Sequence, residues 1–278
     1  MEILPDCLPC MLRQALSAAR KASSDERKVE NVCRNAAYIL ANSDKCSCAP
    51  QLCRLIHREV KNITGCDDPY LEDKFREIRL AQENLPILKS YVENSPQPLE
   101  AAVRAAALGN IIDAGADSSF IPEKLEEELK VPFQRFQIEE FKKSLSKAET
   151  VLYIGDNSGE AVFDCLLLEK LGDKKIYFAV RGEAILNDVT ESTAQLAGVE
   201  NYAEIVSAGS GSPGCIISEC GKEFKELFNK ADMVIAKGQG NFEALSGSER
   251  EIFFLLKAKC PAIAGRLGVD ILSYVLKT

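Results

Sequence analysis

The chain has 278 residues, a length that fits roughly two domains of about 150 residues, each able to bury a hydrophobic core. It carries 34 basic and 42 acidic residues, a net charge of −8, and no short run is dominated by Lys or Arg, which argues against nucleic acid or an anionic membrane as a partner. No stretch approaches the roughly 18 to 20 uninterrupted apolar residues of a membrane span, and the N-terminus lacks a signal peptide, so we expect a cytoplasmic protein.

The first half of the chain has the periodicity of helices. Up to about residue 130, apolar residues recur every three or four positions, and the breaks between segments are rich in Ser, Asp, Asn and Pro. The pattern predicts helices over residues 7–21, 29–42, 49–63, 68–92 and 98–115. We therefore expect residues 1–130 to form a helical domain.

The second half, residues 131–278, has a different pattern. Short apolar, β-rich runs alternate with helical segments, and they cover residues 150–155, 175–181, 203–209, 232–238 and 252–258. Apolar strands separated by helices are typical of a parallel sheet that is buried on both faces. We therefore expect this half to be an α/β layer fold with a mainly parallel sheet.

Polar and glycine-rich segments follow the predicted strands, and ligands of open parallel sheets bind beyond the carboxyl ends of the strands. Asp156 and Asn157 leave the first strand, and Asp188 follows the second strand. Ser158, a candidate phosphate-binding residue, is placed to cap the next helix. Two carboxylates and an amide are hard oxygen donors that suit Mg²⁺ or Mn²⁺, with other transition ions also compatible. The alternative is that the two acids only offset the positive ends of the helices that follow.

Two lysines leave later strands on the same edge. Lys237 follows the fourth predicted strand and Lys259 the fifth, and both are cations suited to phosphate oxygens. Gly240 and Asn241 come just after Lys237, where backbone N–H groups and a helix start can bind phosphate. Cations beside a metal site indicate a phosphorylated substrate, and the alternative is that each lysine simply extends from a strand end into solvent.

The segment GSGSPG, residues 209–214, formally matches the G-x-G-x-x-G pattern of dinucleotide-binding folds. In such folds an acid that binds the ribose closes the next strand, about 20 residues further on. Here that strand ends in Lys237, and Asp232 stands at its beginning. We interpret the segment as a flexible phosphate or substrate loop, with a plain glycine turn as the alternative.

The single histidine, His57, lies among charged residues at helical spacing, and we expect it on a solvent-exposed helix face. Catalytic systems built on a histidine either depend on this one ring or are excluded, as is any site with several histidine ligands.

The eleven cysteines are concentrated in the first quarter of the chain. An odd number without a secretory signal indicates reduced thiols rather than a disulfide framework. Five of them lie close in sequence, namely Cys7 and Cys10 in a C-x-x-C pair, and Cys46, Cys48 and Cys53. Four of these five could bind zinc or an iron–sulfur cluster, but their spacing fits no strong zinc template, and structural thiols are the favoured interpretation.

Seven segments occur in a characteristic order along nearly the whole chain, namely CLPC, DPYLEDK, ALGNIID, YIGDNSGEAVFD, ILND, AKGQGNFEAL and LLKAKC. With them the chain resembles the metal-dependent damage-control phosphatases, formerly a domain of unknown function. The N-terminal C-x-x-C is similar to that of their stand-alone prokaryotic branch.

This resemblance implies an N-terminal helical domain packed on a Rossmann-like α/β/α domain. It implies a divalent metal held by Asp156, Asn157 and Asp188, with phosphate or substrate contacts from the KGQGN segment and Lys259. Asn110, in ALGNIID, would reach the site from the helical domain, which places the cleft between the domains. Family members hydrolyse phosphate from sugar phosphates, phosphopantetheine derivatives, or related and often damaged metabolites.

The hypothesis we favour is a metal-dependent phosphomonoester hydrolase in which Lys259, with Lys237 nearby, stabilises charge on the phosphoryl oxygens. The nucleophile is either Asp156 or water. The substrate is a small phosphorylated metabolite, with nucleotide-related compounds among the candidates, and the sequence does not identify it. It does not indicate the oligomeric state either. One alternative is a carboxyl methyltransferase with a Rossmann-like fold, supported only by GSGSPG. The other is a non-catalytic, cysteine-rich metal-binding or redox module.

Overall fold

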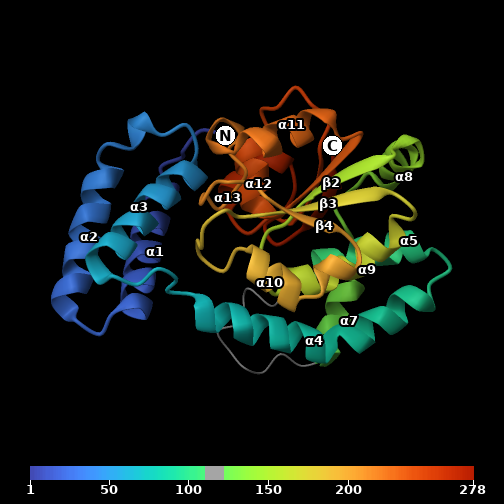
Figure 1. The fold of residues 1–278 in the computed structure, drawn as a ribbon, viewed down its shortest axis with the longest axis horizontal. Coiled ribbons are helices and arrows are strands. Elements are labelled where there is room, and N and C mark those ends of the chain that lie inside the picture. Colours follow the sequence, from blue (N-terminus) through green and yellow to red (C-terminus); the bar gives the residue numbers. More distant parts are fainter. Residues whose placement is uncertain (110–121) are drawn as a thin grey trace.

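Three helices form a separate unit at one end of the molecule (Figure 1). The structure, a computed structural model, describes residues 1–109 and 122–278. The unit consists of α1 (Cys7–Ala22), α2 (Glu26–Leu40), the short 3-10 helix η1 (Ser43–Lys45) and α3 (Ala49–Thr64). Small and branched side chains at helical spacing, among them Ala15, Val32 and Ile56, form a hydrophobic core of this unit.

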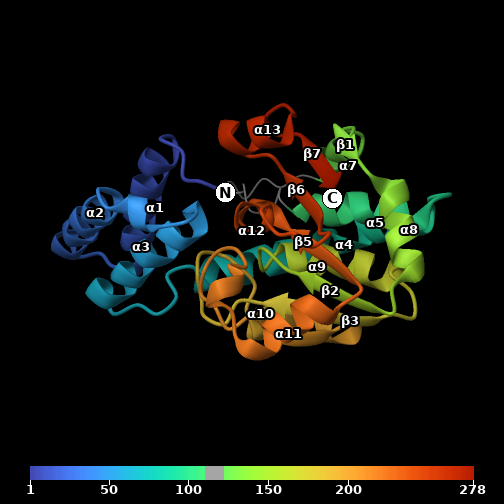
Figure 2. The ribbon, with the colours of Figure 1, turned by 90° about the horizontal axis from the view of Figure 1, so that it is seen from above.

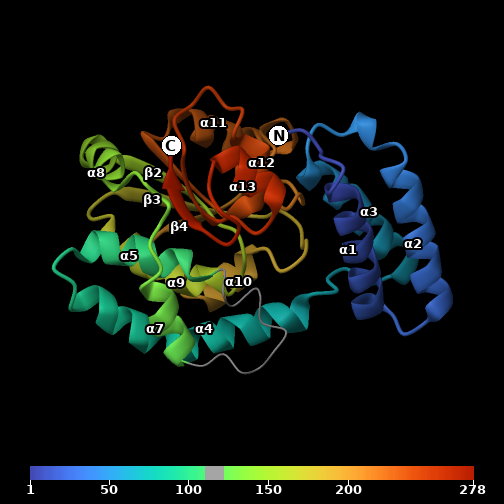
Figure 3. The same ribbon diagram turned by 180° about the vertical axis from the view of Figure 1, so that it is seen from behind.

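The next helices belong to the sheet rather than to this unit (Figures 1 and 3). They are α4 (Leu71–Glu93), α5 (Pro98–Ala107) and α7 (Pro122–Leu129). Ile78, Leu88 and Val103 of α4 and α5 lie in the same hydrophobic core as the sheet residues. The cores therefore divide the chain between α3 and α4, earlier than the predicted boundary at residue 130, because α4 and α5 bury their apolar faces on the sheet layer.

Over the described residues, the sheet has seven strands in the order β1-β7-β6-β5-β2-β3-β4. Their bounds are β1 (Arg135–Phe136), β2 (Thr150–Ile154), β3 (Lys175–Val180), β4 (Glu204–Ser207), β5 (Met233–Lys237), β6 (Phe253–Lys257) and β7 (Tyr274–Lys277). All neighbours are parallel except β6 and β7, which confirms the predicted α/β fold with a mainly parallel sheet. The sequence did not indicate β1, which has two residues, or β7, which lies at the end of the chain.

Helices cover both faces of the sheet (Figure 2). Residues alternate between the two faces along a strand. Val151 and Tyr153 of β2 face the core shared with α4, α5, α8 (Ile138–Lys147) and α9 (Glu160–Lys170). Leu152 and Ile154 face the core shared with α11 (Lys222–Lys230), α12 (Gly238–Leu245) and α13 (Pro261–Leu267). The 3-10 helices η2 (Val199–Asn201) and η3 (Ile217–Glu219) and helix α10 (Glu191–Leu196) lie in the connections. None of the helices in the described ranges combines the length and the hydropathy of a membrane span.

His57 is buried, with 3% of its surface exposed, and the expectation of a solvent-exposed face was wrong. Its position in α3 explains the difference, because it follows Cys53 by four residues and precedes Val60 by three, and all three side chains are buried. Burial, together with the nearby charge of Lys61, lowers the pKa of the ring to about 4. The ring is therefore a neutral core residue.

Candidate active site

The carboxyl ends of β2 and β5 meet where the strand order reverses. β2 pairs with β3 on one side and with β5 on the other, and open α/β sheets bind ligands at such a point. Asp156 follows β2 and Gly238 follows β5. A Cβ atom on Gly238 would overlap the Asp156 carboxylate, so the two strand ends are in direct contact.

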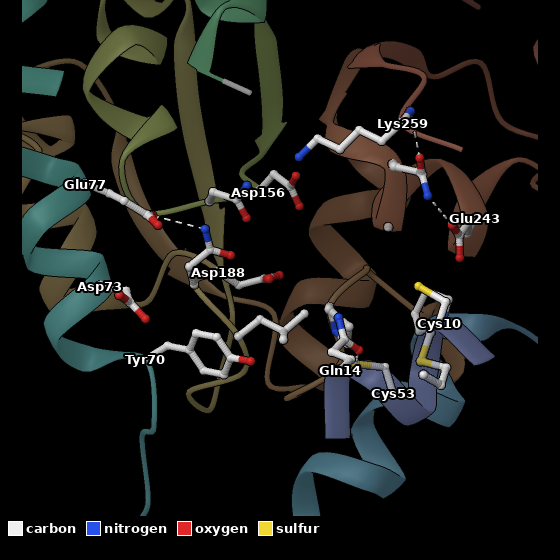
Figure 4. Close-up of a pocket in the computed structure, with 18 of the residues that line it drawn as sticks. Cys10, Gln14, Cys53, Tyr70, Asp73, Glu77, Asp156, Asp188, Glu243 and Lys259 are labelled. Atoms are coloured by element: carbon white, nitrogen blue, oxygen red, sulfur yellow. Dashed lines mark hydrogen bonds between the residues drawn. The ribbon is translucent and has the colours of Figure 1, made fainter. Parts of the chain in front are cut away.

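A cavity of about 450 Å³ opens at this point, between the strand ends and the three-helix unit (Figure 4). Five of the residues predicted from the sequence line it, namely Asp156, Asn157, Asp188, Gly240 and Lys259. The opposite wall comes from α1, α3 and α4, as the resemblance implied for a cleft between helical and α/β parts. Asn110, the residue expected to reach the site from the helices, lies outside the described residues.

Backbone hydrogen bonds hold the loops after β2 and β3 together. Asn157 and Asp188 form an isolated antiparallel bridge, and the Ser158 N–H donates to the Asn187 carbonyl over 2.8 Å. The buried Ser158 hydroxyl donates to the Asp188 carbonyl over 3.1 Å. Ser158 is not among the residues that line the cavity, in contrast to the phosphate contact expected for it, and it stabilises the two loops. The backbone brings the two carboxylates and the Asn157 amide to one place.

Arg181, directly after β3, is a site residue that sequence reasoning missed. Its side chain is buried, and Nε donates to Asp188 Oδ2 over 2.6 Å. Nη2 lies 3.7 Å from Asp156 Oδ1, and Nη1 and Nη2 have no hydrogen-bond partner among the described residues. The guanidinium thus faces both acids as a positive charge, and the signal in the sequence was an Arg at the carboxyl end of a predicted strand.

Burial raises the pKa of the Asp156 carboxyl well above its usual range. The charges of Glu160 and Asp188 raise it further, and those of Arg181 and Lys259 lower it. The buried carboxyl is therefore favoured in its neutral form, and a cation bound beside it would favour the ionised form.

Glu160, the first residue of α9, is the second site residue that was missed. It is 1% exposed, and its Oε1 accepts a hydrogen bond from Asn157 Nδ2 over 3.2 Å. Its position three residues after Asn157 places it beside the amide within the first turn of the helix. An acid at that spacing in DNSGE was the available signal.

Lys237 does not line the cavity, in contrast to the phosphate contact expected for it. Its ammonium is fully buried and donates to Ala106 O, Glu160 Oε2 and Asp164 Oδ1 over 2.9, 3.1 and 2.6 Å. The alternation of β5 explains this direction, since Met233 and Ile235 face the same core below the edge of the sheet. An ammonium has three protons, and three acceptors already take them.

Asn241 is also occupied by structural contacts. Its Oδ1 accepts from the Cys215 N–H over 2.9 Å, and its Nδ2 donates to the carbonyls of Gly155 and Lys237 over 3.1 and 2.7 Å. The side chain therefore joins the ends of β2 and β5 to the loop that contains GSGSPG. Only Gly240 of the predicted pair reaches the cavity.

The GSGSPG loop follows β4, the edge strand of the sheet, rather than a strand at the reversal point. A Cβ on Gly214 would strike the Gly240 backbone, which explains the glycine there as close packing of two loops. Pro213 of this loop lines the cavity. These contacts describe a packed loop at the rim and give no support to a dinucleotide-type cofactor site.

Lys259 extends across the cavity toward Asp156 from the opposite side (Figure 4). Its backbone N–H donates to Gln239 Oε1 over 3.2 Å, and Gln239 Nε2 donates to Glu243 Oε1 over 3.0 Å. Burial raises the pKa of Glu243, which lines the same side of the cavity. Lys259 thus brings a positive charge to the mouth of a mostly acidic cavity.

The helical wall carries a set of polar side chains that the sequence analysis did not select. Asp73 pairs with Lys21 and Arg76 over 2.5 and 2.7 Å, and Glu77 accepts from Asn187 Nδ2 over 3.0 Å. Asp73 and Glu77 are four residues apart on one face of α4, a spacing visible in the sequence. This wall is polar and charged, which suits a hydrophilic substrate.

All eleven cysteines are free thiols in the structure. Cys10 and Cys53 line the helical side of the cavity, and Cys53 donates to Gln14 Oε1 over 3.1 Å. Within the part of the chain that the structure describes, no three His, Cys, Asp or Glu side chains are grouped to hold a metal ion by themselves. The strand-end site combines two acids with an amide.

Comparisons with known proteins agree with this architecture. The family model of the damage-control phosphatase ARMT1-like domain matches residues 3–275. A damage-control phosphatase of Pyrococcus horikoshii is 37% identical over 278 residues, covering 97% of this chain and 95% of its own length. One from Archaeoglobus fulgidus is 35% identical over 291 aligned residues, covering 100% of this chain and 99% of its own. A crystal structure of a DUF89 family protein from P. horikoshii superimposes with a TM-score of 0.92 at 34% identity, covering 99% of this chain and 98% of that one.

Proposed function

Because this chain belongs to the ARMT1-like damage-control phosphatase family, we propose that it is a metal-dependent phosphatase of a small phosphorylated metabolite. The observation that carries the proposal is the convergence of Asp156, Asn157 and Asp188 on one polar cavity at the reversal point of the sheet. Lys259 on the other side of that cavity adds the positive charge that a phosphate ester requires.

The charges around these residues fit a divalent cation. Among the described residues at this end of the sheet, the acids Asp156, Glu160, Asp164 and Asp188 and the bases Arg181 and Lys237 are each at most 9% exposed, and Asp73 and Glu77 of α4, equally buried, line the same cavity. Acids therefore outnumber bases in a buried place, where an unpaired charge is costly. A divalent cation offsets that excess, and the oxygen donors of two carboxylates and an amide suit Mg²⁺ or Mn²⁺.

In this mechanism Asp156, Asn157 and Asp188 would hold the cation, which when bound polarises a phosphoryl oxygen. Arg181 holds the Asp188 carboxylate through its Nε, so that this acid keeps one orientation. Lys259 attracts the phosphoryl group and offsets negative charge that develops on its oxygens. The polar wall of α4 faces the remainder of the substrate, since Asp73 and Glu77 line the same cavity.

The attacking group is either the Asp156 carboxylate or a water molecule. The stereochemistry at a chiral, isotopically labelled phosphoryl group separates the two routes. Attack by Asp156 forms a phosphoaspartate that water then hydrolyses at phosphorus, and these two in-line displacements give net retention, whereas a single direct attack by water gives inversion.

The principal test is release of phosphate from p-nitrophenyl phosphate with Mg²⁺ or Mn²⁺ and with neither. We expect Asp156→Ala to abolish the metal-dependent activity. The matched control is Asp232→Ala, because Asp232 stands at the opposite end of β5 and accepts from the N–H groups of Glu149 and Thr150. If Asp156→Ala hydrolyses the ester as fast as the wild type, the proposed role of this residue fails.

The substrate class is tested by a screen of sugar phosphates, nucleotides and phosphopantetheine compounds against several divalent ions. We expect charged, hydrophilic phosphomonoesters to be the best substrates, because the cavity wall opposite the strand ends is polar. A protein that cleaves none of them with any ion contradicts the proposal.

A further inference from the structure

A buried network of charges lies directly beneath the proposed cation site. Its centre is Lys237, whose ammonium donates to Ala106 O, Glu160 Oε2 and Asp164 Oδ1. The three distances are 2.9, 3.1 and 2.6 Å, and the side chain has no exposed surface. All three protons of the ammonium are used, so a phosphate oxygen could bind only if one of these bonds were broken.

Glu160 connects this lysine to the cavity. One carboxylate oxygen, Oε2, accepts from Lys237, and the other, Oε1, accepts from Asn157 Nδ2 over 3.2 Å. A carboxylate only accepts hydrogen bonds, so it selects the NH₂ end of the amide and turns the Asn157 oxygen away from itself. The oxygen is the atom with which an amide binds a hard cation.

The network is held rigidly from behind. The Tyr153 hydroxyl donates to Asp164 Oδ1 over 2.7 Å, and both side chains are fully buried. Gly109, two residues after the end of α5, packs so closely against Glu160 that a Cβ on it would lie 2.5 Å from Glu160 Cγ. Glu160 therefore has little room to rotate, and its two oxygens keep their separate partners.

We propose that Lys237 is a positioning residue, which acts through Glu160 to hold the Asn157 amide with its oxygen toward the cation site. This inference rests on the proposed function, because it assigns a role toward the cation of that site. It also assigns Lys237, the lysine of the KGQGN segment, a role other than contact with phosphate.

The test measures binding of Mn²⁺ alone, from the electron paramagnetic resonance signal of the free ion, and compares four proteins with the wild type. Three alter the network: Lys237→Met, Glu160→Gln and the double variant. The fourth, Lys74→Met, is the matched control, because Lys74 is likewise fully buried and is paired with Asp68 over 2.8 Å outside this network. kcat, KM and inhibition by inorganic phosphate are measured on the same proteins.

We expect Lys237→Met and Glu160→Gln each to raise the Kd of Mn²⁺ roughly 10- to 100-fold, the usual effect of losing an outer partner of a ligand. In Glu160→Gln the Lys237 ammonium donates to the oxygen of the new amide, so the NH₂ group of that amide faces Asn157 and draws the Asn157 oxygen away from the cation site. In the double variant the oxygen of the new amide no longer binds a lysine and can again accept from Asn157 Nδ2. We therefore expect the double variant to bind Mn²⁺ more tightly than Glu160→Gln, a coupling that loss of structure alone does not produce.

Three results would overturn the inference. The first is Lys237→Met with wild-type Mn²⁺ affinity and weakened phosphate inhibition, since that describes a lysine that contacts phosphate. The second is a double variant whose effects simply add. The third is an equal loss of Mn²⁺ affinity in Lys74→Met. If the wild type itself binds no Mn²⁺ and yet hydrolyses esters, the proposed metal dependence fails first, and the outcomes are thereby distinguished.

Discussion

Replacement of Gly238 by Ala tests whether the contact between the ends of β2 and β5 positions Asp156. Gly238 has a φ of +78°, in the left-handed region, and a Cβ there would overlap Oδ2 and Cγ of Asp156. The variant therefore combines a backbone penalty with a forced movement of the carboxylate. We expect the movement to lower kcat/KM about 100-fold, because displacements near 1 Å at a reacting group have effects of that order.

Gly65→Ala is the matched control for the backbone penalty. Gly65 ends α3 with a φ of +77°, and a Cβ at this position meets nothing within 4 Å. Both variants pay about 1–2 kcal/mol for a left-handed non-glycine residue, and at 2–4 °C per kcal/mol this lowers Tm by about 2–8 °C. Only Gly238→Ala adds a clash.

The assay measures thermal unfolding and the hydrolysis of p-nitrophenyl phosphate on both variants and the wild type. We expect Gly65→Ala to lose stability and to keep its activity, and Gly238→Ala to lose both. If Gly238→Ala lowers Tm like the control and retains full kcat/KM, then the contact with Asp156 does not position that carboxylate, and the reasoning is refuted.

Two further predictions concern groups with shifted pKa values. Asp156→Asn should abolish activity and raise the Tm of the metal-free protein at pH 7. The pKa of Asp156 is raised in the folded protein, so the folded state loses stability relative to the unfolded chain as the pH rises above about 4. In melting curves without metal, the higher Tm of the variant should therefore disappear below that pH. A variant no more stable than the wild type at pH 7 contradicts the charge excess. The wild type should lose about 3 kcal/mol of unfolding free energy as the pH falls from 6.5 to 4, because the folded protein keeps the His57 ring neutral, with a pKa of about 4, whereas the unfolded chain protonates it. His57→Gln should not show this loss. Urea unfolding of both proteins across that range measures the difference, and parallel curves would show that the ring does not carry it.

The site residues that the sequence could identify are those whose position along the chain determines their place in space. Asp156, Asp188 and Lys259 each follow a strand, and the carboxyl ends of parallel strands lie on one edge of the sheet. The positions of the strand ends were therefore sufficient to predict that these residues lie on the same edge, without knowing which strands are neighbours.

Residues whose role depends on the direction in which the side chain points could not be assigned in this way. Lys237 ends a strand as Lys259 follows one, yet its side chain lies on the face that α5 and α9 cover, and there it meets Glu160 and Asp164. Arg181 was missed for the corresponding reason, since its importance comes from the two acids that other loops bring beside it. Each pairing joins residues that lie in different elements.

Local periodicity by itself determined the α/β character of the chain, its five main strands and the edge on which the polar residues gather, because hydrophobic spacing and strand direction are properties of short segments. The tertiary structure alone decided that β2 lies between β3 and β5, that the three-helix unit closes one side of the cavity, and that Arg181 and Lys237 pair with buried acids of other elements. These features arise from contacts between segments that are distant in sequence, and the energy of such contacts cannot be read from a local pattern of residues.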